Sequence, residues 1–197
     1  MMWGGVVLYL AYTFVLYCFD VHFNKLFVVY CLGLGLSFYS LIYFLSTQNK
    51  QNIVYAGGEP ATRVIGIYFI IIAMLFYFLW LAEVVPASIQ NTIPKSVAEA
   101  GLFTNGVQVL DLAVILPAIF ITGILLMRRI SLGFMLAPVI LTFFILMDIT
   151  IGALAVVMKV KGVEVDLMLT GIMSVLTLVS VSFLIWYFKD VKTESRS

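Results

Sequence analysis

The chain has 197 residues, of which 63% are hydrophobic and only 11% are charged, and its mean hydropathy is +1.15. Soluble domains carry about 25% charged residues, and a soluble chain this apolar would expose large apolar patches and precipitate. The net charge of +1 offers no basic surface for a nucleic acid. Composition therefore excludes an ordinary soluble domain, and the length suits one compact membrane unit.

Six long apolar runs predict transmembrane helices. A bilayer core of about 30 Å needs about 20 helical residues, and barrel strands would alternate apolar and polar residues. Runs such as IGIYFIIIAMLFYFLWLA do not alternate. We therefore predict an all-α integral membrane bundle of six transmembrane helices, with a single domain over residues 1–188 and a solvated tail over 189–197. The predicted spans are Trp3–Phe19, Leu26–Leu45, Val64–Val85, Val107–Met127, Ile130–Met158 and Leu167–Phe188.

The first span follows the start of the chain directly, and no signal peptide is visible. The first basic residue is Lys25, and no small-residue cleavage site follows the apolar run. We expect either an inserted anchor helix or a numbering that begins within a longer natural protein. Cys18 and Cys31 flank the next turn, where they either approach each other or act as unpaired, buried apolar residues; the second interpretation is favoured.

The longest connection is predicted from Pro86 to Gly106. Within it, Pro94 can begin a short helix and Gly101 can end one. This segment is either an interfacial helix over the mouth of the bundle or a plain amphipathic connector. Trp3, Trp80 and Trp186 fall near predicted span ends, as in an aromatic belt.

The distribution of Lys and Arg predicts the orientation. Cytoplasmic loops carry an excess of these residues, and the short Arg128-Arg129 turn weighs most. We expect both termini in the cytoplasm and the protein in a bacterial inner membrane. The predicted cytoplasmic side holds Lys50, Arg63, Arg128, Arg129, Lys189, Lys192 and Arg196, and the other side holds Lys25, Lys95, Lys159 and Lys161.

Ionisable residues within the spans are the candidates for function. Asp148 lies inside the run FFILMDITIGALA, where a carboxylate costs several kcal/mol unless it is paired, hydrated or protonated. Gly152 and Ala155 on its face predict close approach of another helix, so Asp148 should face the bundle. Asp111 lies about one turn inside the fourth span, before Pro117, which is expected to bend that helix.

In the predicted topology these acids share the outer half of the protein with several hydroxyl and amide groups. We hypothesise a polar cavity open to the outside. Two structural alternatives stay open: hydroxyl residues often only pack helices together, and acids near span ends are often helix-end partners, which is the stronger interpretation for Glu83. The candidate cavity residues are Asp20, His22, Asn24, Glu83, Asp111, Asp148, Thr170 and Ser174.

Several enzyme classes lose support. A single histidine cannot supply a bis-histidine haem site, and two cysteines cannot complete a structural zinc site. The sequence has no H-E-x-x-H, G-x-S-x-G or C-x-x-C motif. We therefore predict no cofactor, no metal site and no catalytic residue, although an enzyme is not excluded.

Two stretches resemble a set of uncharacterised bacterial multi-pass membrane proteins. They are LYLAYTFVLYCFDVHFNKLFVVYCLGLGLSFYSLIYFL and WLAEVVPASIQNTIPKSVAEAGLFTNGVQVLDLAVILPAIFITGILLMRRISLGFMLAP. That set has no assigned activity, so the resemblance implies a membrane fold and no chemistry. It draws attention to Asn24 and Asp111, and it implies further apolar sequence before residue 1. Its distinctive elements are Phe23-Asn24, Val109-Leu110-Asp111-Leu112 with Leu116-Pro117, and Arg128-Arg129 followed by Gly133.

The favoured interpretation is a small transporter, channel or permease-like subunit with Asp148 as its deep ion- or proton-linked carboxylate. The expected partners are the lipid bilayer and a small molecule or ion, with no nucleic acid; protein partners stay open. One alternative is a non-catalytic sensor, assembly or partner subunit. A second alternative is an intramembrane enzyme that acts on a lipid or quinone.

Overall fold

The computed structural model describes the chain except residues 22, 49–58, 163–166 and 191–197. All regular structure in the described part is helical, and six of its segments are long and apolar enough to cross a membrane. The predicted all-α class and the number of spans are confirmed. The last helix continues through Asp190, two residues past the predicted start of the tail at residue 189. The rest of that tail lies outside the described residues.

The long helices are α1 (Met2–Phe19), α2 (Phe27–Gln48), α3 (Glu59–Gln90), α7 (Ser131–Val160) and α8 (Leu167–Asp190). The fourth span is composite. It consists of α5 (Gly106–Leu110), the π-helical segment η1 (Asp111–Ile115) and α6 (Leu116–Met127). A short helix, α4 (Lys95–Ala100), lies between the third and fourth spans.

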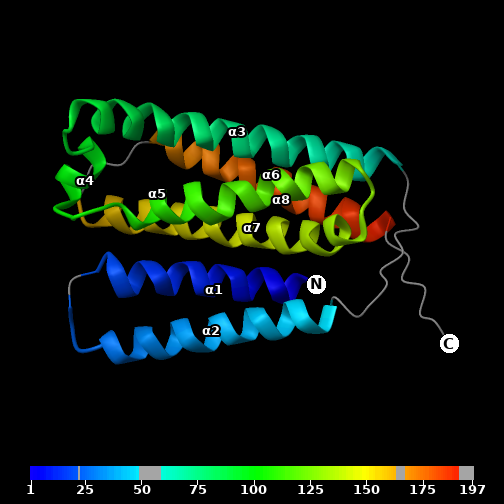
Figure 1. Ribbon diagram of the computed structural model, residues 1–197, viewed down its shortest axis with the longest axis horizontal. Coiled ribbons are helices and arrows are strands. Elements are labelled where there is room, and N and C mark those ends of the chain that lie inside the picture. Colours follow the sequence, from blue (N-terminus) through cyan, green and yellow to red (C-terminus); the bar gives the residue numbers. More distant parts are fainter. Residues whose placement is uncertain (22, 49–58, 163–166, 191–197) are drawn as a thin grey trace.

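Four spans form the main unit of the bundle. Helix α3 packs against α6, α6 against α7, and α7 against α8, while α8 also contacts α3. Helix α1 packs against α7, and α2 is added at the edge, mainly against α1 (Figure 1). Much of α2 is therefore exposed, including Leu36 and Tyr39, as expected for a helix that faces lipid.

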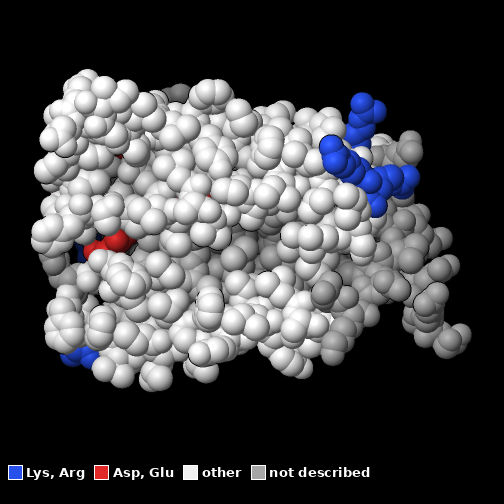
Figure 2. Space-filling model, in the orientation of Figure 1, with Lys and Arg blue, Asp and Glu red and all other residues white. Residues whose placement is uncertain are grey.

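The helices alternate in direction, so the bundle has two distinct ends (Figure 1). The arginine end holds Met1, the beginning of α3 with Arg63, and the α6–α7 turn with Arg128 and Arg129. The α4 end holds α4 and the α1–α2 turn. Figure 2 shows the largest group of basic side chains at the arginine end and a group of acidic atoms in a hollow at the α4 end.

Glycines allow the closest helix contacts. A Cβ added at Gly66 of α3 would lie 2.8 Å from the carbonyl oxygen of Gly123 on α6, and a Cβ at Gly123 would lie 2.8 Å from that of Gly66. On the other side of the bundle, Gly5 of α1 lies directly against Thr142 of α7. Small residues at such crossings let helix backbones approach in a membrane, where packing holds helices together.

The third span is longer than predicted, because α3 continues past Pro86 to Gln90. Proline removes one helical hydrogen bond. Because Pro86 lies close to the end of α3, the loss of this one bond does not end the helix. The predicted start of the following connection at Pro86 is therefore wrong, but the limits of its short helix are confirmed: α4 begins after Pro94, and Gly101, with a left-handed φ of 64°, caps its end.

The helix around Pro117 is not an ordinary α-helix, and the bend predicted there stays a prediction. The turn before it, Asp111–Ile115, is π-helical, and the π-segment leads directly into α6 with Pro117 in its first turn. An interior proline clashes with the carbonyl group four residues earlier, here that of Ala113. The wider π-turn relieves this conflict, and such segments are common at functional sites.

Candidate functional site

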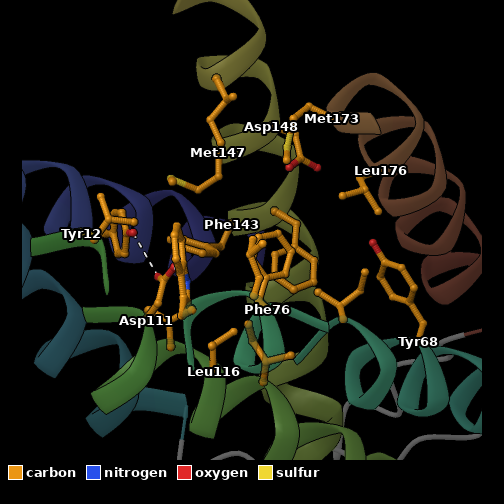
Figure 3. Close-up of a pocket in the computed structure, with 18 residues that line it drawn as sticks. Tyr12, Tyr68, Phe76, Asp111, Leu116, Phe143, Met147, Asp148, Met173 and Leu176 are labelled. Atoms are coloured by element: carbon orange, nitrogen blue, oxygen red, sulfur yellow. Dashed lines mark hydrogen bonds between the residues drawn. The ribbon is translucent and has the colours of Figure 1, made fainter. Parts of the chain in front are cut away.

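A cavity of about 270 Å³ lies among α3, α6 with η1, α7 and α8 (Figure 3). Its lining is mainly apolar, whereas the hypothesis drawn from the sequence was a polar cavity. Asp111 and Asp148 are its two acidic residues, so Asp148, the acid that the sequence placed deepest, shares one cavity with Asp111. The aromatic lining residues are Tyr12, Tyr68, Phe76, Trp80, Phe143 and Phe144.

Asp111 is fully engaged by neighbouring helices. The hydroxyl group of Tyr12 on α1 donates to Oδ1 at 3.0 Å, and Nε1 of Trp80 on α3 donates to Oδ2 at 3.0 Å. Hydrogen bonds to a charged acceptor are stronger than neutral ones. Asp111 therefore joins three spans at the point where the fourth span becomes π-helical.

Asp148 differs from Asp111 in having no such partners. Its side chain is half-buried and lines the cavity, and among the described residues none forms a hydrogen bond or ion pair with it. Figure 3 shows its carboxylate beside Met173, across the cavity from Asp111 and Tyr12. The nearby hydroxyl group of Tyr68 is already hydrogen-bonded to Ser180 Oγ at 3.0 Å.

Asp148 faces the bundle as predicted, but the predicted reason is wrong. Among the described residues nothing lies within 4 Å of a Cβ added at Gly152, so no described part of another helix packs closely there. Asp148 lies twelve residues before the end of α7, or roughly 18 Å along the helix axis. A carboxylate at this depth, in an apolar cavity, lacks the hydration that it would have in water.

Glu83 lies outside the cavity and holds the connection at the α4 end. Its Oε1 accepts a hydrogen bond of 2.8 Å from the backbone N–H of Ser96, in the first turn of α4, and Oε2 accepts one of 2.7 Å from Gln108 Nε2. Both contacts tie α3 to later segments of the chain. This geometry matches the helix-end role that the sequence favoured for Glu83.

Asp20 also binds a helix end. Its carboxylate lies against Gly106, the first residue of α5, and accepts a hydrogen bond from the backbone of that residue. Burial raises the pKa of Asp20 above its ordinary value, and the hydrogen bond from Gly106 opposes this rise. Asn24 shapes the α1–α2 turn, since its Oδ1 accepts from the backbone N–H of Leu26 at 2.9 Å.

The remaining candidates do not extend the cavity. Ser174 is exposed on α8 and is not part of the lining. Thr170 belongs to α8, but its side chain lies outside the described residues, as does His22. Of the eight candidates, the structure places Asp111 and Asp148 in the cavity, and it places Asp20, Asn24 and Glu83 at helix ends and turns.

Sequence reasoning missed the two donors to Asp111. Trp80 was assigned to an aromatic belt and not to the site, but its indole N–H points to Asp111. Tyr12 is one of ten tyrosines, and no local pattern distinguishes it. Gln108 was also missed, although a polar side chain inside an apolar span is a signal that could have identified it.

The described residues contain no group of three His, Cys, Asp or Glu side chains that could hold a metal ion. Comparison of the chain with protein-family models, with curated proteins and with solved structures finds no match. The resemblance to bacterial multi-pass proteins stays a prediction.

Proposed function

We propose that the protein is a small transporter or permease-like membrane protein whose cavity binds a small organic cation. The observation that carries the proposal is the carboxylate of Asp148, which faces an otherwise apolar cavity and has no partner among the described residues. A desolvated carboxylate is stabilised by a counter-ion or by a proton. A bound cation supplies the positive charge that balances the carboxylate.

The rest of the lining suits the apolar body of such a ligand. Small-molecule sites are concave and mostly apolar, with few polar groups that orient the ligand. Aromatic faces also attract cations, and the cavity presents rings from α1, α3 and α7. A volume of about 270 Å³ limits the ligand to a small molecule. Asp111, already held by Tyr12 and Trp80, shapes the wall.

The proposal includes an orientation. The arginine end, with Arg63, Arg128 and Arg129, faces the cytoplasm of a bacterial inner membrane, following the excess of basic residues on cytoplasmic loops. The cavity lies nearer the α4 end, because it includes Val107 and Trp80. It is therefore accessible from the outer half of the membrane, and transport requires a second state that opens towards the arginine end.

The test compares a cation with its neutral isostere. Benzyltrimethylammonium is titrated into the purified protein in lipid nanodiscs, and binding is measured by calorimetry. Neopentylbenzene, in which carbon replaces the ammonium nitrogen, is the charge control. We expect the cation to bind more tightly, and Asp148→Asn to weaken its binding roughly tenfold or more, equivalent to about 1.4 kcal/mol.

Glu99→Gln is the matched control, because it neutralises an exposed acid on α4, away from the cavity. It should leave binding unchanged. Uptake of the cation into proteoliposomes then separates transport from binding alone. Equal affinity for the cation and the neutral isostere, or full binding by Asp148→Asn, would overturn the proposal.

A further inference from the structure

Helices α1 and α2 pack in a defined antiparallel register. The rings of Tyr17 and Tyr30 stack with their centroids 5.2 Å apart, and the ring of Phe14 lies directly against Gly33. A step of three residues back along α1 thus matches a step of three residues forward along α2. Two contacts therefore fix which residues face each other near the α4 end.

This register places Cys18 and Cys31 together. Each cysteine follows one of the stacked tyrosines, and one residue rotates the side chain by about 100° around its helix. Because the helices run in opposite directions, both rotations lead to the same side of the contact. Each step also moves about 1.5 Å along the axis, so the two cysteines are offset by about 3 Å.

The side chains themselves agree with this geometry. The thiol groups of Cys18 and Cys31 lie close enough to influence each other. Cys18 is half-buried, and Cys31 is exposed. The favoured interpretation of two buried thiols is therefore wrong for Cys31, because α2 is covered mainly on its α1 side. Both residues lie within about one turn of their helix ends.

We propose that Cys18 and Cys31 form a reversible disulfide that links α2 to α1. The oxidant is a low-molecular-weight or protein disulfide. One cysteine thiolate attacks a sulfur of the oxidant and releases one thiol, and the second cysteine then displaces the other. Both protein S–H bonds are lost, one S–S bond forms, and the oxidant disulfide is reduced to two thiols that take up the protons and the electron pair.

The link has a specific structural consequence. Helix α2 joins the bundle mainly through α1, so the disulfide covalently fixes the outermost helix to α1 at the α4 end. Disulfides need Cα atoms about 4.4–6.8 Å apart, which demands close helix approach. The contact of Phe14 with Gly33, which has no side chain, favours such an approach two residues beyond Cys31.

The test uses the full chain in detergent micelles with dithiodipyridine, a membrane-permeant disulfide. Intact mass and released thiopyridone are measured, and remaining thiols are counted by alkylation. The wild-type protein should release two thiopyridones, retain no pyridyl group and stay monomeric on a non-reducing gel. Cys18→Ser and Cys31→Ser should each keep one pyridyl group. Oxidised wild-type protein should melt several degrees higher, and reduction should reverse this shift.

A register control makes the test specific. Cys31→Ser combined with Leu32→Cys moves the thiol to a neighbouring position whose side chain is 62% exposed, so this variant should retain pyridyl groups instead of closing a disulfide. Persistent pyridyl groups on the wild-type protein would overturn the proposal. So would unreacted thiols, disulfide-linked dimers, or equal closure in the register control.

Discussion

At the scale of single residues, the two aspartates of the cavity have opposite environments. Asp111 accepts hydrogen bonds from Tyr12 and Trp80, both at 3.0 Å, whereas no described residue bonds to Asp148. Satisfied polar groups inside a protein stabilise it, and unpaired charges destabilise it. Asp111 therefore belongs to the architecture of the site, and Asp148 is the group free to bind.

Neutralising the two aspartates should affect stability in opposite ways. We expect Asp111→Ala to lower the free energy of unfolding by about 1–3 kcal/mol, because it leaves two donors without an acceptor. Asp148→Asn should leave stability unchanged or raise it, because it removes an unpaired charge. Thermal melting in detergent, followed by size-exclusion chromatography, measures both. If Asp148→Asn is the less stable variant, Asp148 has a structural role and the binding proposal loses its basis.

At the scale of elements, the connection between α3 and α5 is held by side chains and not by its own helix. Helix α4 has only six residues, too few to be stable alone in water. Glu83 binds the first turn of α4 and also Gln108 of α5. One carboxylate thus positions the short helix and the start of the fourth span.

Removing this carboxylate should loosen the connection. We expect Glu83→Ala to increase the rate of limited proteolysis within residues 91–105 several-fold. Glu99→Ala is the matched control, because the Lys95–Glu99 pair of 3.5 Å is exposed and such pairs contribute little. Mass spectrometry of the fragments locates the cuts. Equal cleavage rates for the two variants would contradict this role of Glu83.

At the scale of the whole molecule, the bundle depends on backbone contact between α3 and α6. Gly66 and Gly123 each lie where a Cβ would come within 2.8 Å of the other's carbonyl oxygen. We expect Gly66→Ala to lower the free energy of unfolding by about 1–3 kcal/mol, as overpacking does. Gly152→Ala, with nothing within 4 Å, should be neutral or stabilising in the same melting assay. Similar destabilisation by both would show that the effect of Gly66→Ala is not specific to the α3–α6 crossing.

The orientation of the whole bundle is tested by labelling. In a Cys18→Ser, Cys31→Ser background, Glu99→Cys places a thiol at the α4 end and Ser131→Cys places one at the arginine end. With a membrane-impermeant maleimide on bacterial spheroplasts, we expect Glu99→Cys to react at once and Ser131→Cys only after lysis. The reverse pattern would invert the proposed orientation and leave the fold untouched.

The sequence alone determined the membrane class, the six spans and the limits of α4. Hydropathy is summed over about 20 neighbouring residues, and the short helix is bounded by Pro94 and Gly101, so both signals are local. The local rule that a proline interrupts a helix did not predict the structure at two positions. Helix α3 continues past Pro86, and the helix widens into a π-turn before Pro117. At both positions the hydrogen bonds and packing of the remaining long helix stabilise a helical conformation that the proline alone disfavours.

Only the tertiary structure decided which ionisable residues form a site. Tyr12 and Asp111 are 99 residues apart in the chain, and Trp80 and Asp111 are 31 apart. Their contacts depend on how each helix is rotated about its axis and on how far α3 extends. An apolar sequence leaves this rotation undetermined, because lipid and the surfaces of neighbouring helices are similarly apolar. The same reason explains why Asp148 could be named from the sequence, whereas its lack of a partner could not.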